Sequence, residues 1–191
     1  STFDTTLFAP IDHDNSHDDK WDIEVPFKIS VGAGTDLDAV VNLTIYDDAP
    51  QAKNDNETTH REVTEAEAAI SGNVMTNTSD AGADIKGADL GTTVDTFTYI
   101  DKNGDEITAD ADGSEVTTRY GKLKVDSDGS WEFTPDSSVP QDSSGKTASN
   151  FSYTIKDYDG DESSAIQYID ILDGPDPEID NSNNTDITVK E

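Results

Sequence analysis

Cysteine is absent from this sequence and basic residues are scarce, with 12 Lys and Arg against 42 Asp and Glu in 191 residues. The lack of cysteine excludes disulfide staples, thiolate metal sites and cysteine catalysis. No run approaches the ~18 apolar residues of a membrane span, so we expect no membrane insertion. A net charge of −30 repels phosphate backbones, and we therefore expect no nucleic-acid partner.

Hydrophobic residues are also few, at 32% of the chain. Low hydrophobicity combined with high net charge is typical of disordered chains, but here the apolar residues are concentrated in short alternating runs. One interpretation is a folded protein whose carboxylates are neutralised by bound cations, above all calcium, which takes several oxygen ligands. The alternative is an ordinary acidic, solvated surface, as in salt-tolerant proteins. Composition alone does not separate the two.

Runs in which apolar or β-branched residues alternate with polar ones predict β-strands, because successive side chains of a strand point to opposite faces. In one of them, Val94–Ile100, strict alternation puts Val94 and Phe97 on opposite faces. The other runs are Phe27–Val31, Val41–Ile45, Leu123–Val125, Trp131–Phe133, Phe151–Ile155 and Ile166–Ile171.

Asn-Gly and Asp-Gly pairs stand between these runs, with their glycines at Gly104, Gly113, Gly129 and Gly160. Such pairs supply the positive φ angles of tight hairpins. The only helical candidate is 64–70, which has capping-box spacing at its start but is equally compatible with a loop. The sequence therefore predicts an all-β fold.

Two segments of the chain resemble each other in sequence. Residues 27–50 and 151–177 each read as an aromatic-led strand, an acidic loop, a β-branched strand and a linker containing Asp and Pro. This predicts the C-terminal part of a preceding β-sandwich repeat, either intact or split, at 1–47, a complete repeat at 48–174, and a linker with the first strand of a following repeat at 175–191. About three strands cannot close a core, so the first piece must pair with another polypeptide, an upstream half or a neighbouring copy.

Six segments follow one another in a recognisable order: Ala49-Pro50, Asn54-Asp55, Ser71–Val74, Tyr120–Val125, Asp128–Pro135 and Phe151–Asp161. Together they resemble the cadherin-like and VCBS-like repeats of giant RTX-type, calcium-dependent adhesins. That resemblance implies an immunoglobulin-like or cadherin-like β-sandwich, type I secretion from Gram-negative bacteria, and calcium bound in and between tandem domains.

Two acidic turns place oxygen side chains at alternate positions around a glycine, as in the first half of an EF-hand loop. The alternative for both is a hairpin turn with solvated acids. The family pattern favours calcium at the second turn more than at the first. The predicted ligands are Asp101, Asn103 and Asp105 in the first turn, and Asp157, Asp159 and Asp161 in the second.

The linkers at the two ends of the complete repeat also concentrate carboxylates beside proline. Such clusters repel unless a cation bridges them, and a bridging ion would fix the angle between neighbouring sandwiches. The alternative is a flexible acidic linker. The predicted calcium ligands there are Asp47, Asp48, Asp55, Glu65, Asp173 and Asp176.

No Gly-x-Ser-x-Gly, His-Glu-x-x-His or phosphate-binding glycine loop occurs, so we expect no enzyme. The sequence and the resemblance together predict a calcium-rigidified extender repeat of an extracellular, cell-surface adhesin used in bacterial attachment or biofilm formation. Its partners would be the neighbouring repeats of the same polypeptide. The alternative is part of a ligand-binding region of such an adhesin, which would hold surface glycans or peptides.

Overall fold

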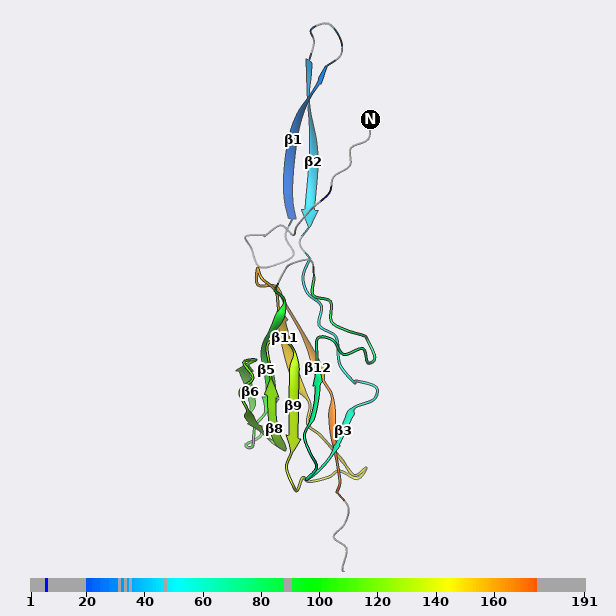
Figure 1. Ribbon diagram of the computed structural model, residues 1–191, viewed down its shortest axis with the longest axis vertical. Helices are drawn as coiled ribbons and strands as arrows, with labels where there is room; N and C mark the ends of the chain where they lie inside the picture. The colour runs from blue at the N-terminus through cyan, green and yellow to red at the C-terminus, as the bar shows by residue number, and fades with distance from the viewer. Residues whose placement is uncertain are drawn as a thin grey trace, which may run out of the picture.

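The computed structural model describes residues 6, 20–30, 32, 34, 36–46, 48–87 and 91–174, and within them every regular element is a strand (Figure 1). None of these segments forms a helix long and apolar enough to cross a lipid bilayer. The strands are β1 Lys20–Ser30, β2 Asp36–Tyr46, β3 Arg61–Thr64, β4 Ile70–Asn73, β5 Thr93–Ile100, β6 Glu106–Asp110, β7 Val116–Thr118, β8 Gly121–Val125, β9 Ser130–Pro135, β10 Lys146–Ala148, β11 Phe151–Lys156, β12 Glu162–Gln167 and β13 Ile169–Leu172.

The described part of the chain from residue 48 onward forms several small sheets that are consistent with a β-sandwich, and it is called the sandwich below. One antiparallel sheet has the order β12-β11-β5-β6 and a second has the order β4-β9-β8-β7. A three-stranded sheet, β10-β13-β3, contains the one parallel pair among the described strands, β13 with β3. The all-β prediction is confirmed, and the antiparallel sheets are consistent with the predicted sandwich.

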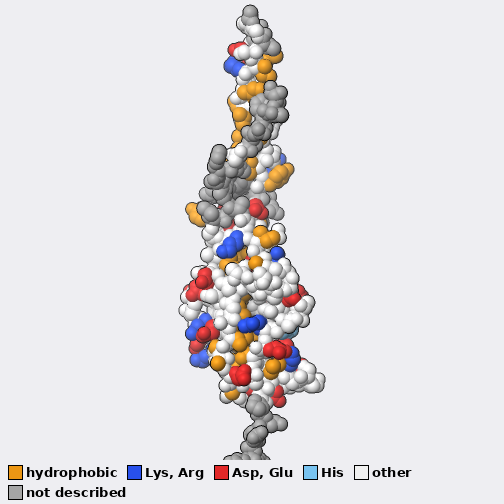
Figure 2. Space-filling view, turned by 45° about the vertical axis from the view of Figure 1, so that its right-hand side comes forward, with side chains coloured by type: hydrophobic (Ala, Val, Ile, Leu, Met, Phe, Trp, Pro, Cys, Tyr) orange, Lys and Arg blue, Asp and Glu red, His pale blue; other side chains and the backbone are white. Residues whose placement is uncertain are grey.

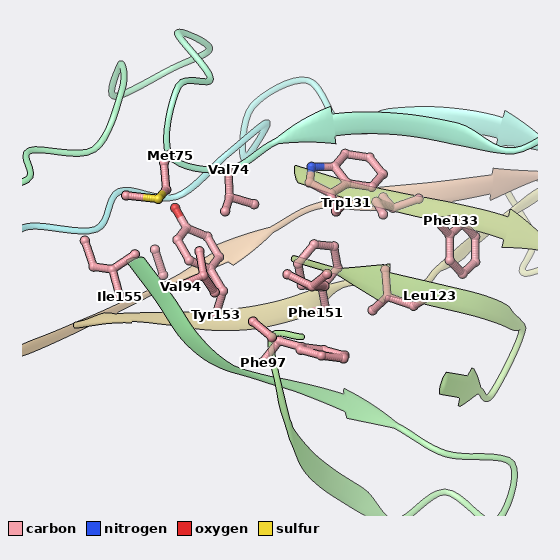
Figure 3. Packing of buried hydrophobic residues seen from close by; sticks show 14 of the residues in the cluster. Val74, Met75, Val94, Phe97, Leu123, Trp131, Phe133, Phe151, Tyr153 and Ile155 are labelled. Carbon is pink, nitrogen blue, oxygen red and sulfur yellow. The ribbon is translucent and has the colours of Figure 1, made fainter. Parts of the chain in front are cut away.

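Alternating apolar side chains from the facing sheets form one core (Figure 3). Trp131 of β9 meets Phe151 of β11 edge-to-face, with ring centroids 5.8 Å apart, and so joins the two layers. Burial of such alternating aromatic and β-branched residues is the main stabilising contribution in a sandwich of this kind. The core residues are Val63, Val74, Met75, Val94, Phe97, Ala111, Leu123, Val125, Trp131, Phe133, Val139, Phe151, Tyr153, Ile155, Ala165, Ile169 and Ile171.

Strand β5 departs from the strict alternation that its sequence predicts. Val94 and Phe97 are both buried in the core, although their odd spacing should put them on opposite faces. Opposite β11, the register shifts, because Ile155 pairs with Val94 whereas Thr154 pairs with Thr96. This β-bulge adds one residue to β5 and turns both side chains inward. The prediction of opposite faces was therefore wrong.

The segment 64–70 is a turn and not a helix. The Glu67 N–H donates to the Thr64 carbonyl at 3.2 Å, and β4 begins at Ile70. The predicted hairpin glycines are confirmed, since Gly104, Gly113, Gly129 and Gly160 all have positive φ angles.

The run Ile166–Ile171, predicted as one strand, is divided at Tyr168. Before Tyr168 the chain forms β12, which pairs with β11, and after it the chain forms β13, which pairs with β3 in a different sheet. The Tyr168 N–H donates to the Asp55 carbonyl at 3.0 Å, and its carbonyl accepts from the Arg61 N–H at 3.1 Å. Both backbone groups thus find partners while the strand changes sheet, which satisfies the requirement for paired buried backbone.

Strands β1 and β2 form a separate two-stranded antiparallel sheet of eleven residue pairs, from Lys20 opposite Tyr46 to Ser30 opposite Asp36. Figure 1 shows this hairpin projecting along the long axis beyond the end of the sandwich. It leads through Asp48 into the first segment of the sandwich.

Candidate metal centre

One five-residue turn occurs three times in the described chain, at 101–105, 142–146 and 157–161. In each, the N–H of the first residue donates to the carbonyl of the fifth, at 2.9, 3.0 and 3.2 Å respectively. The N–H of the fifth residue donates back to Oδ1 of the leading aspartate, at 2.9, 3.2 and 2.8 Å. The leading aspartate therefore closes each turn, as Asx turns do.

Each turn has glycine at its fourth position, with φ of +90° at Gly104, +74° at Gly145 and +110° at Gly160. A residue with a Cβ atom is strained at these angles, which explains the shared Asp-x-x-Gly pattern. The sequence pattern thus fixes the backbone of all three turns.

Only the third turn gathers acidic side chains. One ligand oxygen from each of Asp157, Asp159 and Asp161 lies within 4.8 Å of the others, and no other group of three acidic or histidine side chains converges in this way among the described residues. The turn joins β11 to β12, so two paired strands hold its ends. This cluster, named the Asp157 triad below, could hold a metal ion.

Burial distinguishes the triad from an exposed acidic patch. Asp157 and Asp161 are 6% and 7% exposed. Oδ2 of Asp157 and both carboxylate oxygens of Asp159 are inaccessible to water and accept no hydrogen bond. Buried charged oxygens are stable only when paired or bound to a metal, so this arrangement favours a cation.

The pKa values of the leading aspartates move in opposite directions in otherwise similar turns. Burial, and then the neighbouring Asp159 carboxyl, raises the pKa of Asp157 to about 6. In contrast, the Asp105 backbone N–H holds the pKa of Asp101 below its ordinary value. Hydrogen bonds from Ser144 likewise lower the pKa of Asp142. Crowding and desolvation of its carboxylates therefore lower the stability of the folded state when the Asp157 triad is ionised and holds no counter-ion.

The chemistry of the donors indicates the class of ion. All three side chains offer hard carboxylate oxygens, and neither histidine nor cysteine contributes. Such a set suits calcium, magnesium or manganese and is a poor site for zinc or copper. Calcium takes 6–8 oxygens, so carbonyls or water molecules would complete its shell.

The triad lies at the end of the sandwich nearest the β1–β2 hairpin (Figure 1). Ala52, which follows Asp48 and Pro50, donates its N–H to Ser163 Oγ at 2.9 Å, two residues beyond Asp161. The segment that follows Asp48 therefore runs beside the strand that leaves the triad. Asp47 lies outside the described residues.

Asp55, predicted as a linker ligand, lies inside the sandwich. It is fully buried, and the Tyr153 hydroxyl lies 3.2 Å from its Oδ2 and 3.1 Å from Asp84 Oδ2. Burial, and then the nearby Asp84 carboxyl, raises the pKa of Asp55 to about 7. Sequence reasoning missed Asp84 because no motif links two acids that β11 brings together through a tyrosine.

Glu65 and Asp173 lie at the opposite end of the sandwich, where β3 and β13 end side by side. Glu65 Oε2 accepts from the Val139 N–H at 2.8 Å, and Oε1 accepts from the Gly174 N–H at 3.4 Å. Glu65 thus holds the segment by which the chain leaves the sandwich, and Asp173 is exposed beside it. Asp176 lies outside the described residues.

The first predicted EF-hand-like turn is exposed. Asp101 Oδ1 accepts N–H groups from Asn103 and Asp105, and its Oδ2 accepts from the Asn103 amide at 3.0 Å. The Asp101 carboxylate and the Asn103 side chain are therefore used within the turn. Asp105 stays exposed to water.

A comparison with protein-family models and a search of curated proteins gave no match. The coarse part of the resemblance agrees with the structure, which is all-β, has several small sheets and carries a buried acidic triad.

Proposed function

We propose that this chain is a calcium-rigidified extender repeat of a bacterial cell-surface adhesin, acting outside the cell. The observation that carries the proposal is the Asp157 triad, in which three carboxylates converge and buried oxygens of Asp157 and Asp159 accept no hydrogen bond. The sandwich fold and the resemblance of its motifs to calcium-dependent adhesin repeats support it further. The partners proposed for it are the neighbouring repeats of the same polypeptide.

The proposed mechanism is electrostatic. Without a cation, the three carboxylates repel at neutral pH and loosen the turn between β11 and β12. A bound calcium ion would remove that repulsion and fix the end of the sandwich where the chain arrives from the hairpin. Since an ion that binds only the folded state stabilises it, calcium would make the repeat resist unfolding under tension.

An extended rod also requires that the other end of the repeat, near Glu65 and Asp173, be fixed to the next repeat. Glu65 already binds the backbone of Val139 and Gly174, so the departing chain is held to the sandwich before any ion is considered. Asp173 would add a carboxylate to a junction with the next repeat. Successive repeats would then be fixed at both ends.

Thermal unfolding tests the proposal. We expect the melting temperature in calcium at about 100-fold above Kd to exceed that in EDTA by about 5–10 °C, because such binding contributes about 2.7 kcal/mol. Magnesium at the same concentration should give a smaller rise, since it tolerates a flexible carboxylate site less well. A melting temperature that calcium leaves unchanged would refute the proposal and favour a solvated acidic surface.

A groove supports the alternative proposal, a ligand-binding region. It has a volume of about 460 Å³ and includes Tyr99, Tyr120 and Asn150 in its lining. Arg119 lies 5.2 Å above the Tyr120 ring, and this combination of aromatic faces and polar groups suits a sugar. Binding to a glycan array that Tyr120→Ala abolishes would favour this function, whereas an array without signal would favour the extender.

A further inference from the structure

The β1–β2 hairpin has one fully apolar face. Because directly opposed residues of an antiparallel pair share a face, its register sorts the side chains without ambiguity. Every pair on this face joins two apolar residues. The five pairs are Trp21 with Ile45, Ile23 with Leu43, Val25 with Val41, Phe27 with Ala39, and Ile29 with Leu37.

Four of the ten side chains on this apolar face are exposed to water, and the other six are half-buried. Trp21 and Leu37 are each 53% exposed, and Val25 and Ile29 are exposed as well. Figure 2 shows apolar side chains gathered along the projecting part of the molecule. The opposite face carries charged residues, including the ion pair between Lys28 and Asp38. An isolated two-stranded hairpin is marginal in water, so a face of this kind is typical of a surface that another layer covers.

A second copy of the same ribbon lies inside the sandwich. It consists of β10 and β11 on one side and β12 and β13 on the other, paired antiparallel like β1 and β2. The internal repeat aligns Phe27 with Phe151 and Ile45 with Ile171. Four more residues of the apolar face have buried counterparts, namely Ile29 with Tyr153, Ala39 with Ala165, Val41 with Gln167 and Leu43 with Ile169. The last four residues of the face, Trp21, Ile23, Val25 and Leu37, align with the half-buried Gly145, Thr147, Ser149 and Ser163.

The first six of these counterparts are buried. Phe151 is 2% exposed and Ile171 is fully buried, and the other four are core or buried positions too. The layer that covers them includes β8 and β9, whose Leu123, Trp131 and Phe133 point into the same core (Figure 3). The molecule therefore displays, in its own second repeat, the kind of surface that fits the apolar face of the hairpin.

The covered ribbon also differs in shape from the exposed one. It bends between two sheets, at Ser149–Asn150 on one strand and at Tyr168 on the other. The Ser149 backbone N–H donates to the Ile169 carbonyl at 2.9 Å, and the Asn150 side-chain Oδ1 accepts from the Ile169 N–H at 2.9 Å. Backbone and side chain together therefore hold the bend. The β1–β2 pair instead continues without interruption through eleven pairs.

We propose that the β1–β2 hairpin is the last ribbon of a second β-sandwich. The partner that covers the apolar face is a half-repeat patterned like residues 48–135, placed before the hairpin in the same polypeptide. Residues 48–172 follow the same order, because their covering layer also precedes their ribbon. A second copy of this chain is the poorer fit, because its own β8–β9 layer is already covered by its own ribbon. Two chains of net charge −30 also repel each other. The proposal does not depend on calcium binding.

A fusion tests this directly. Residues 48–135 are placed ahead of Ser1 of the full chain, and residues 1–19 then span the connection that the intact repeat makes with residues 136–145. Hydrogen exchange at 20–46 is compared with that of the chain alone. We expect exchange to slow by about 100-fold or more, because amides in a closed sandwich exchange only through larger openings.

Two adjacent residues provide the matched variants. Val41→Asp places a carboxylate on the apolar face and should abolish the added protection in the fusion. Val40→Asp should retain it, because Val40 lies opposite Pro26 on the other face and is exposed. The proposal is overturned if the fusion gives 20–46 no added protection, or if both variants behave alike. It is also overturned if the chain alone sediments as a dimer that Val41→Asp dissociates, since the occupant would then be a second copy.

Discussion

The turns at 101–105 and 157–161 share the residues Asp-x-(Asn/Asp)-Gly-Asp, each followed by Glu, and the same backbone hydrogen bonds, but their carboxylates have different surroundings. In the first, three N–H donors from the turn itself satisfy the Asp101 carboxylate. In the second, the end of the sandwich buries Asp157 and Asp161 and brings Asp159 against them. One pattern thus yields a plain hairpin in one place and a candidate cation site in another.

The difference shows that the residue pattern sets the backbone, whereas burial sets what the acids can do. The turn at 142–146 sharpens this point, because it has the same closure with serine at its third position and lysine at its fifth. Its aspartate has a lowered pKa, as Asp101 has. Only where several desolvated carboxylates meet does the pKa of the leading aspartate rise.

The largest difference in stability between the two turns should come from replacing the leading aspartate of each in separate variants. Asp157→Ala leaves the Gly160 and Asp161 N–H groups without their acceptor and removes a ligand of the triad. We expect it to lower the free energy of unfolding in calcium by about 2–4 kcal/mol, measured by urea denaturation. Asp101→Ala should have a clearly smaller effect, because water can replace an exposed acceptor. Equal losses in the two variants would mean that burial does not distinguish the turns.

Asp159→Asn should change the sign of its effect with calcium. In EDTA at pH 7 it removes one of three crowded charges and should stabilise the protein by about 1 kcal/mol. In calcium at about 100-fold above Kd it should destabilise by about 1–2 kcal/mol, because the loss of up to about 2.7 kcal/mol of calcium stabilisation outweighs the relieved repulsion. Paired melts in the two buffers measure both values.

The matched control for that experiment is Asp105→Asn in the exposed turn. It removes the same charge from the same kind of loop, so its melting temperature should respond to calcium as the wild type does. A reversal of sign in Asp105→Asn as well would assign the effect to overall charge and not to the triad.

The pH dependence should also separate the turns. Because the pKa of Asp157 is raised to about 6, the folded state binds this proton more tightly than the unfolded state, so stability in EDTA should fall as pH rises from about 4 to about 6. Asp55, raised to about 7, acts in the same direction, and Asp55→Asn removes its share. The pKa of Asp101 is lowered, so its contribution to the free energy of unfolding should be lost only as the solution becomes strongly acidic.

Urea denaturation between about pH 4 and pH 7, in EDTA and again in saturating calcium, measures these effects. Saturating calcium should suppress the fall in stability that is due to Asp157.

The smallest change concerns Tyr158, which lies within the Asp157 turn and is 75% exposed. Terbium replaces calcium at oxygen sites and luminesces when a nearby tyrosine transfers energy to it. Tyr158→Phe should remove most of that luminescence while leaving the calcium concentration needed to displace terbium unchanged. Luminescence that persists in full would place the ion away from this turn.

Much of the fold could be predicted because it depends on local patterns. Alternation predicted all or part of β1, β2, β5, β8, β9, β11, β12 and β13, but not the short strands β3, β4, β6, β7 and β10. Asn-Gly or Asp-Gly pairs predicted turns with positive φ angles. The exceptions depend on tertiary contacts. The bulge in β5 exists because β11 pairs with it in a shifted register, and the break at Tyr168 exists because the strand changes sheet. Neither partner can be read from the run itself.

The candidate site follows the same division. The spacing of Asp157, Asp159 and Asp161 predicted their convergence, since all three lie on one turn. Spacing alone did not distinguish the Asp101 turn from it, because burial depends on how the sheets pack, and only the family resemblance favoured calcium at the Asp157 turn. Asp55 was predicted at a linker surface and is a core residue that shares Tyr153 with Asp84.

A calcium titration followed by calorimetry, on the wild type, Asp159→Asn and Asp105→Asn, tests the central claim most directly. We predict that Asp159→Asn binds one calcium ion fewer than the wild type, or binds it at least about tenfold more weakly, a difference of about 1.4 kcal/mol. Asp105→Asn should match the wild type in both number and affinity. If Asp159→Asn binds calcium as the wild type does, the Asp157 triad is not a calcium site and the account given for this repeat is wrong.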